Sequence, residues 1–299
     1  DWLYDTSSLV ALYIYNTEIS GTISDRLWRM SELVQINLHH NKLTGTIPSI
    51  PANASPKTLG CDLSGNQLRG TIPDSLFRLS SMRGLLLNNN TLTGTLPEIP
   101  IPGIVQLVHL DVGRNNLVGT LPSSLWELPS LQSLDLYWNN FNGTINFPQG
   151  TGIMPLKNLW AQRNSFDGTI PTDWSNFPSL EELLLYGNNF ASQPIPQSIL
   201  DLSNLTYVDL SENKFNGSLP SLVNTASLKY LYLNDNNLEG SLPSSLPPLI
   251  TNLWLSNNSL SGTIPDGFYA NSPNLTQVLL QNNLLNGSMP AGACSGGRT

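Results

Sequence analysis

Two aspartates, Asp111 and Asp135, occupy the same position in consecutive copies of a repeated sequence unit. If these copies form neighbouring strands of a sheet, their backbones lie about 4.8 Å apart. A pair of carboxylates at that spacing could serve a retaining glycosidase or hold a cation. On an open strand, however, we expect no pocket and no burial that would shift a carboxyl pKa. The pair therefore predicts solvated charges that steer a binding partner, and no catalytic site.

The histidines predict no further chemistry. His39 and His40 are adjacent on or just after a strand, so their side chains should diverge, and His109 stands alone. The sequence contains no nucleophile–base pair, phosphate-binding loop or zinc-ligand spacing. We therefore predict a non-enzymatic protein without catalytic residues, metal ligands or cofactors.

Aromatic residues gather at the strand positions that should face outward. Ring systems on a solvated sheet are suited to stacking on sugars or gripping a peptide. The alternative is strand propensity alone, which also favours exposed aromatic residues. We predict that this face binds a ligand through ten residues: Asp111, Asp135, Tyr137, Trp138, Trp160, Tyr186, Asp209, Tyr230, Tyr232 and Trp254.

The elements that position these residues are set by a unit of the form L-x-x-L-x-L-x-x-N-x-L-x-G-T-I-P. Its period of 22 to 25 residues indicates a stacked solenoid. The alternation of Leu134, Asp135 and Leu136 predicts a strand with two side chains inside and one outside. Buried amides need hydrogen-bond partners, so we expect the asparagines to bond the backbone of neighbouring coils. Twelve copies align on Thr17, Asn41, Asn66, Asn90, Asn115, Asn139, Asn164, Asn188, Asn213, Asn236, Asn258 and Asn283.

The second half of each unit returns the chain to the next strand. Four return segments, around Trp28, Phe77, Trp126 and Ile199, have helical apolar spacing, whereas residues 51–56, 97–102, 146–155 and 246–248 are rich in proline and should run extended. Ser192 replaces the usual glycine in the eighth copy, where we expect a bulge. Threonines that follow the glycines could bind ice, although pairing of the turn segments is the simpler interpretation.

Composition limits the partners. Of the 299 residues, 11% are charged and the net charge is −8, which argues against nucleic acid or anionic membrane. No apolar run approaches the roughly 18 residues of a membrane span. Cys61 takes a buried strand position and should be an inert thiol, while Cys294 is free or pairs with a cysteine absent from this chain. Candidate N-glycosylation sites are Asn53, Asn89, Asn142, Asn204, Asn216, Asn257, Asn274 and Asn286.

The G-T-I-P segment after the asparagine resembles the plant-type leucine-rich repeat over about residues 9–290. That family includes ectodomains of receptor-like kinases and receptor-like proteins, and secreted polygalacturonase inhibitors. The resemblance implies one α/β solenoid domain, 1–299, a right-handed superhelix of about twelve 22–25-residue repeats. It places a parallel sheet on the concave face and short helical, 3-10 or Pro-rich extended segments on the convex face. The family's caps are missing, so 1–8 and 291–299 are expected to be partial flanks.

The resemblance also implies an extracellular or cell-surface protein without enzyme activity. We predict a recognition module that binds a peptide, protein or polysaccharide through its aromatic and acidic concave face. The alternative is a structural cell-surface or matrix glycoprotein that self-associates end to end into a filament. Missing caps and a two-repeat period of 49 residues favour this alternative.

Overall fold

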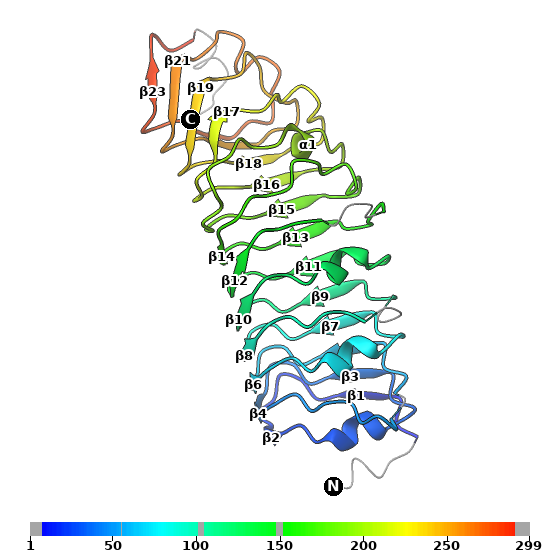
Figure 1. The fold of residues 1–299 in the computed structure, drawn as a ribbon. Helices are drawn as coiled ribbons and strands as arrows, with labels where there is room; N and C mark the ends of the chain where they lie inside the picture. The colour runs from blue at the N-terminus through cyan, green and yellow to red at the C-terminus, as the bar shows by residue number, and fades with distance from the viewer. Residues whose placement is uncertain (1–7, 55, 101–104, 148–151, 291–299) are drawn as a thin grey trace. The chain divides into compact units, whose positions relative to one another are not determined.

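The computed structural model describes residues 8–54, 56–100, 105–147 and 152–290 (Figure 1). The chain forms two compact units, described separately below. Unit 1 contains residues 1–143 and 147–156, and unit 2 contains residues 144–146 and 157–299. The expectation of one domain stays a prediction.

Parallel strands in register form the main sheet of unit 1. Each strand buries its middle residue and turns the flanking residues outward, as Leu110 between His109 and Asp111 shows. We call this outward side, with the residues that directly follow each strand, the strand surface. The strands are β1 (Ala11–Tyr13), β3 (Gln35–Asn37), β5 (Gly60–Asp62), β7 (Gly84–Leu86), β9 (His109–Asp111) and β11 (Ser133–Asp135).

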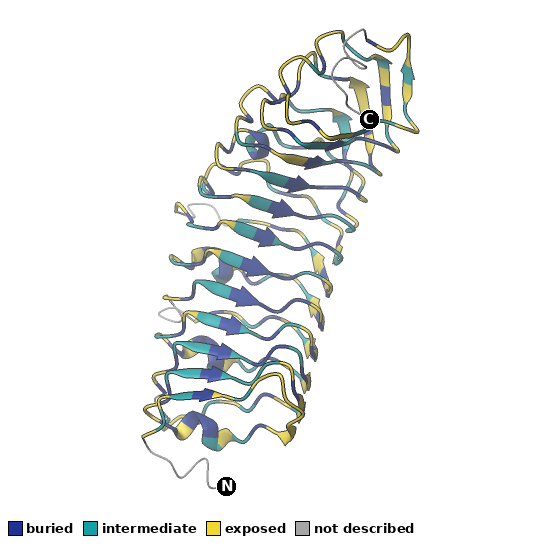
Figure 2. Cartoon of the chain, turned by 180° about the vertical axis from the view of Figure 1, so that it is seen from behind, coloured by how far each residue is buried: buried dark blue, intermediate teal, exposed yellow. Residues whose placement is uncertain are grey.

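Unit 2 repeats this arrangement. Its strands are again parallel, with middle residues such as Leu183, Val208 and Leu231 buried (Figure 2). The predicted alternation along each repeat is therefore confirmed, as is the solenoid fold of about twelve coils. The strands are β13 (Asn158–Trp160), β15 (Glu182–Leu184), β16 (Tyr207–Asp209), β18 (Tyr230–Tyr232), β20 (Asn252–Trp254) and β22 (Gln277–Leu279).

A second set of strands follows the asparagines. In unit 1 these are β2 (Ser20–Thr22), β4 (Lys42–Gly45), β6 (Gln67–Gly70), β8 (Thr91–Gly94), β10 (Asn116–Gly119) and β12 (Asn140–Gly143). Unit 2 contains β14 (Ser165–Phe166), β17 (Asn216–Ser218), β19 (Asn237–Ser241), β21 (Ser259–Thr263) and β23 (Leu284–Asn286).

The glycines of these strands make room for the threonine of the preceding coil. Gly119 has φ +84°, and a Cβ built there would lie 2.8 Å from Cγ2 of Thr95. Gly143 has the same relation to Thr120. The threonine ladder therefore packs coil against coil, which supports the simpler interpretation; ice binding stays a prediction.

Short helical turns lie in the predicted return segments, and most are 3-10 turns. In the described part of the chain they are η2 (Asp25–Arg29), η3 (Asp74–Arg78), η4 (Ser123–Glu127) and the α-helix α1 (Gln197–Leu200). Each buries two apolar residues, such as Leu125 and Trp126. The described parts of the Pro-rich segments contain no helix, as expected from their proline content.

The asparagine ladder is confirmed. In unit 1 the Asn115 amide donates to the carbonyl oxygens of Leu87 and Val112, at 3.1 and 3.0 Å, and accepts the Leu92 N–H at 3.0 Å. In unit 2 Asn236 makes the equivalent bonds to Leu210 and from Phe215. Each amide thus satisfies backbone groups of its own and the preceding coil.

The residue before each ladder position has a left-handed backbone conformation. Among the described residues these are Asn16, His40, Gly65, Asn89, Arg114, Trp138, Arg163, Gly187, Glu212, Asp235, Asn257 and Asn282, all with positive φ. A non-glycine residue in this conformation costs about 1 kcal/mol or more. We attribute the stability of this left-handed conformation to the hydrogen bonds of the asparagine that follows.

The ladder is imperfect near the bulge expected at Ser192. Asn213 donates to Leu185, but its Oδ1 is buried without a hydrogen-bond partner. The second set of strands is also reduced there to an isolated bridge between Pro194 and Asn216. The irregular eighth copy therefore interrupts the bonding pattern.

Candidate ligand-binding surface

The carboxyl groups predicted to be solvated are buried. Asp111 and Asp135 face each other in the register of β9 and β11, and they are 9% and 4% exposed. Asp111 Oδ1 accepts the Gly113 N–H at 2.9 Å, and Asp135 Oδ1 accepts the Ser133 hydroxyl at 3.2 Å. The expectation that an open strand leaves these side chains in water is wrong.

His109 does not stand alone. Its Nε2 lies 2.6 Å from Asp135 Oδ2, diagonally across the two strands. The sequence contained a signal for this contact, because residues two apart on a strand share a face and His109 precedes Asp111 by two. We call His109, Asp111 and Asp135 the acidic cluster.

Burial and hydrogen bonding shift the pKa values of two members of the acidic cluster, Asp111 and His109. Burial raises the pKa of Asp111 to about 7, although its backbone hydrogen bond opposes the shift. The hydrogen bond to Asp135 raises the pKa of His109. Both shifts favour keeping a proton within the cluster at neutral pH.

Tyr137 covers one side of this region. A Cβ at Gly113 would lie 2.5 Å from Cε1 of Tyr137, so the absence of a side chain allows the ring to cross that strand. The Tyr137 hydroxyl bonds to the Asn88 side chain, and burial raises the Tyr137 pKa. The half-buried ring therefore forms a wall beside Asp111 on the strand surface of unit 1.

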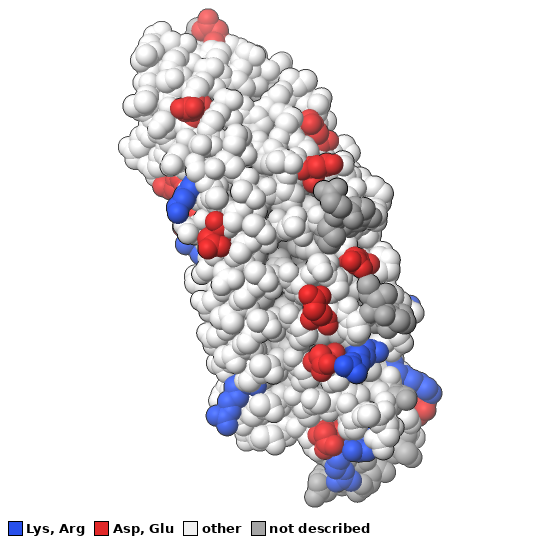
Figure 3. Space-filling model, in the orientation of Figure 1, with Lys and Arg blue, Asp and Glu red and all other residues white. Residues whose placement is uncertain are grey.

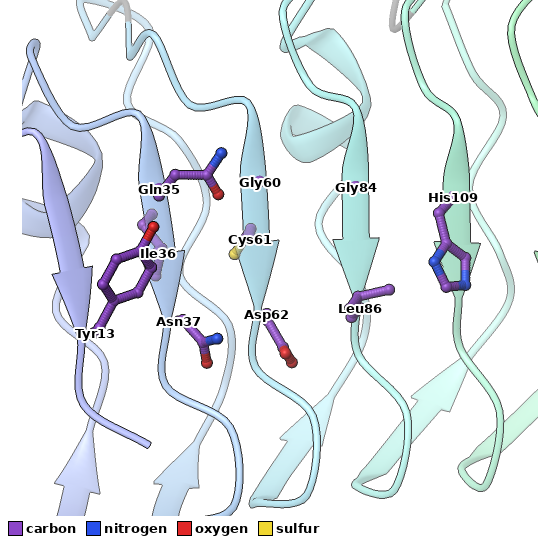
Figure 4. Close-up of a pocket in the computed structure, with 10 residues that line it drawn as sticks. All are labelled: Tyr13, Gln35, Ile36, Asn37, Gly60, Cys61, Asp62, Gly84, Leu86 and His109. Atoms are coloured by element: carbon purple, nitrogen blue, oxygen red, sulfur yellow. The ribbon is translucent and has the colours of Figure 1, made fainter.

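A hollow of about 230 Å³ lies on the other side of His109 (Figure 4). Gly60 and Gly84 have no side chain to fill it, and Gln35 borders the far side. His39 is close to this hollow, with Nδ1 3.2 Å from Asp62 Oδ2. The acidic cluster thus has open space beside its imidazole.

Trp138 is the most exposed of the predicted contact residues in unit 1. Its side chain is 50% exposed, its φ is +54°, and the Arg114 guanidinium lies 5.4 Å from the ring centroid. A bulky residue in the left-handed region is rare. The ring is therefore presented to solvent on a strained backbone.

Four rings form a continuous group on the strand surface of unit 2. We call Tyr207, Tyr230, Tyr232 and Trp254 the aromatic cluster. Tyr232 stacks on Trp254 with centroids 4.2 Å apart, and Tyr207 lies 5.3 Å from Tyr230 and 5.5 Å from Tyr232. Tyr230 is 37% exposed, and the other three are half-buried. The predicted outward position of these rings is correct.

Asp209 lies two residues after Tyr207 in β16 and is in register with Tyr232 of β18. It is 6% exposed, and its Oδ1 accepts the Ser211 N–H at 3.0 Å and the Ser211 hydroxyl at 2.6 Å. Burial raises the Asp209 pKa to about 6, while the Ser211 bonds oppose this shift. Asp209 was predicted as a ligand contact on the outward face, and that role stays a prediction for a carboxyl group that the fold buries.

The remaining predicted contacts in unit 2 are Trp160 and Tyr186, both half-buried. Trp160 Nε1 donates to Glu182 at 2.9 Å. Arg163 lies 5.3 Å from the Tyr186 ring centroid and forms a 2.8 Å ion pair with Glu212. Both rings stay on the strand surface, and neither is packed into the interior.

The candidate glycosylation asparagines lie at the surface, with one exception. Asn216 is half-buried, and its Oδ1 is enclosed without a hydrogen-bond partner. The exposed candidates are Asn53, Asn89, Asn142, Asn204, Asn257, Asn274 and Asn286.

Charged residues are widely spaced on the molecular face shown in Figure 3. Cys61 is 2% exposed, so its predicted core position is confirmed, and burial raises its pKa to about 12, which favours the predicted inertness. Cys294 lies outside the described residues.

Among the residues that the structure describes, every helix is too short or too polar to span a bilayer.

Comparison with known proteins agrees with this fold. The leucine-rich repeat family model matches residues 32–54, 61–79, 106–128, 204–225, 227–249 and 250–271. A search of curated protein sequences finds no match.

Solved structures of plant receptors superpose on the chain. The ectodomain of the Arabidopsis thaliana membrane receptor kinase GASSHO1/SCHENGEN3, in complex with CASPARIAN STRIP INTEGRITY FACTOR 2, has 36% identity and a TM-score of 0.89. That match covers 96% of this chain and 34% of the receptor chain. The Arabidopsis receptor kinase HAESA, in complex with the peptide hormone IDA and the co-receptor SERK1, has 30% identity and a TM-score of 0.86.

The HAESA match covers 94% of this chain and 46% of the HAESA chain. The plant peptide hormone receptor RGFR1, in complex with RGF2, has 25% identity and a TM-score of 0.79, over 96% of this chain and 54% of that one. The chain thus spans about a third to a half of these receptors. Its repeats, its coils and these matches show that it is a leucine-rich-repeat solenoid of the kind found in plant receptor-kinase ectodomains.

Proposed function

We propose that the chain is an extracellular recognition module that binds a peptide along its strand surface. The aromatic cluster of unit 2 carries this proposal, because it places four rings side by side where a ligand can reach them. The solved relatives support it, since HAESA is bound to a peptide hormone and a co-receptor, and RGFR1 is a peptide hormone receptor in complex with RGF2. An extracellular or cell-surface location follows from the same resemblance.

Aromatic rings are effective contacts in such an interface. Tyr and Trp bury large areas at low cost in side-chain entropy and dominate binding energy in many interfaces. The predicted contact residues are Tyr230, Tyr232, Trp254, Trp160, Tyr186 and Asp209 in unit 2, with Tyr137, Trp138, Asp111 and Asp135 in unit 1.

The mutual packing of the rings favours a peptide over a polysaccharide. Tyr232 and Trp254 are stacked with an angle of 22° between their planes, so these two faces are already covered. Sugar binding by stacking uses a free ring face, whereas a peptide side chain can pack against ring edges and bond to hydroxyl groups. Polysaccharide binding is kept as an outcome of the test below.

The proposal is tested by selection and mutation. A phage library of random 12-residue peptides is selected on the tag-free chain, and enriched peptides are synthesised and titrated by calorimetry. The same chain is applied to a glycan array. We expect Trp254→Ala and Tyr230→Ala each to weaken peptide binding roughly 30-fold, the typical loss at a hot spot.

Tyr269→Ala is the control, because Tyr269 is a half-buried aromatic residue of a return segment. It should leave peptide affinity unchanged, and circular dichroism should show all variants folded. Peptides that bind the Trp254→Ala chain as tightly as the original chain, or glycan binding without any enriched peptide, would refute the proposal.

The structural alternative stays a separate prediction. A protein that polymerises end to end would sediment as a concentration-dependent series of species, whereas a recognition module would sediment as a discrete species. Intact mass compared with sequence mass would show whether the candidate asparagines carry glycans.

A further inference from the structure

We propose that His109, Asp111 and Asp135 form a binding site for a divalent transition-metal ion such as Zn²⁺ or Mn²⁺. One ligand atom from each residue, an imidazole nitrogen or a carboxylate oxygen, lies within 4.8 Å of the other two. Ligand atoms around such an ion are each about 2.1 Å from it, so opposite ligands lie roughly 4.2 Å apart. Small side-chain rotations would therefore bring all three groups into coordination distance.

The hydrogen bonds of the cluster leave a position for a cation. Asp111 is 9% exposed, and the bond from Gly113 occupies its Oδ1. Its second oxygen accepts no hydrogen bond from any residue that the structure describes, although it belongs to a nine-tenths buried side chain that meets Asp135 and His109. This oxygen is available to coordinate an ion, and coordination would offset the cost of holding the carboxylate largely out of water.

No basic side chain already fills this role. Within the described part of the chain, the only basic group paired with Asp111 or Asp135 is His109 itself. Two buried carboxylates therefore share one imidazole. On metal binding, the proton held between His109 Nε2 and Asp135 Oδ2 would leave to solvent, because metal ligands bind in their deprotonated forms.

The donor set determines the class of metal. Imidazole suits Zn²⁺ and other transition metals, whereas Ca²⁺ and Mg²⁺ select oxygen ligands. One nitrogen and two carboxylate oxygens suit Zn²⁺ and Mn²⁺, with remaining coordination positions taken by water. The His109 side chain is 40% exposed, so water can reach the imidazole end of the site.

The test titrates the tag-free chain with ZnCl₂, MnCl₂ and CaCl₂ by calorimetry, and follows bound Mn²⁺ by electron paramagnetic resonance. We expect one Zn²⁺ or Mn²⁺ per chain and no comparable binding of Ca²⁺. Asp111→Asn and His109→Gln should each weaken binding roughly 100-fold or more.

Asp62→Asn is the matched control. Asp62 occupies the same strand position as Asp111, and its carboxylate also lies beside a histidine, His39, but no second carboxylate completes that pair. Asp62 acts on His109 and Asp111 only through its charge, so Asp62→Asn should weaken metal binding far less than Asp111→Asn does. Equal thermal unfolding temperatures of the metal-free proteins would exclude misfolding.

Three results would overturn the proposal. These are absence of Zn²⁺ and Mn²⁺ binding, binding that survives Asp111→Asn and His109→Gln, or tighter binding of Ca²⁺. If no metal binds but the Arg- or Lys-containing members of a peptide library bind and require Asp111, the cluster instead receives a cationic side chain.

Discussion

Asp209→Asn tests the buried carboxylate of unit 2 through the pH dependence of stability. The folded protein holds this carboxyl at 6% exposure, and its pKa rises to about 6 from an ordinary value of 3.8. Asparagine has nearly the same shape and keeps an oxygen for the Ser211 N–H and hydroxyl, which now bond to Oδ1. The substitution therefore removes the charge with little change of packing.

The sign of the effect follows from the raised pKa. The folded state binds this proton more tightly than the unfolded chain, so the resulting stabilisation is complete below pH 3.8 and is lost as the pH rises through 6. A shift from 3.8 to about 6 corresponds to about 3 kcal/mol of unfolding free energy. The Asp209→Asn variant has no carboxyl group at this position, so its unfolding free energy does not fall for this reason as the pH rises. Relative to the original chain, it should gain roughly 2.5 kcal/mol between pH 4 and pH 7.5, because part of the loss already occurs below pH 4.

The assay is urea unfolding followed by tryptophan fluorescence from pH 4 to pH 7.5, with equal urea dependence required of both proteins. The difference between the two unfolding free energies isolates Asp209, because other titrating groups are common to both. Asp266→Asn, at an exposed position, is the control and should show no pH-dependent difference. A constant difference across this range would show that folding leaves the Asp209 pKa unchanged, and one that shrinks with rising pH would show that folding lowers it; either result would refute the reasoning.

Three further predictions concern the coils. Asn115→Ala should lower the unfolding free energy by about 3 kcal/mol because it leaves buried backbone groups unpaired. Asn213→Ala should lower the unfolding free energy by at least about 1 kcal/mol less than Asn115→Ala does, since Asn213 Oδ1 already has no partner. Both are measured by urea unfolding. Gly119→Ala should cost about 2 kcal/mol through its positive φ and the contact with Thr95, and adding Thr95→Ser should recover only the contact part. Cys61 should resist iodoacetamide at pH 8 until the chain unfolds, as peptide mass mapping can establish, because burial raises its pKa to about 12.

The sequence predicts the coil interior well because the same few residues recur in every copy. Leu134 and Asn139 each follow a local rule, strand alternation in one case and the need to bond a buried amide in the other. The core residues of one coil pack against the same residue types in the next coil, since the next coil presents the same pattern. Long-range contacts of the core therefore follow from short-range sequence.

The strand surface is less predictable because its burial depends on unlike residues of adjacent coils. Asp111 was expected in water, but Tyr137 crosses Gly113 beside it and His109 approaches Asp135 diagonally. None of these five residues is of a type that recurs at its repeat position in every copy. The repeat rule therefore gives their location and leaves their contacts undetermined, and contacts determine both burial and pKa.

The left-handed position before each ladder asparagine shows where the chain departs from what folding alone requires. Glycine occupies this position in two coils without strain, as Gly65 does with φ +63°. Trp138 adopts the same conformation at a cost of about 1 kcal/mol or more and leaves half of its side chain in water. Neither propensity nor burial favours a tryptophan there. The same conformation recurs at the other non-glycine residues of this position, so the strain belongs to the ladder. The large, half-exposed ring of Trp138 is therefore the feature that supports ligand contact at the strand surface of unit 1.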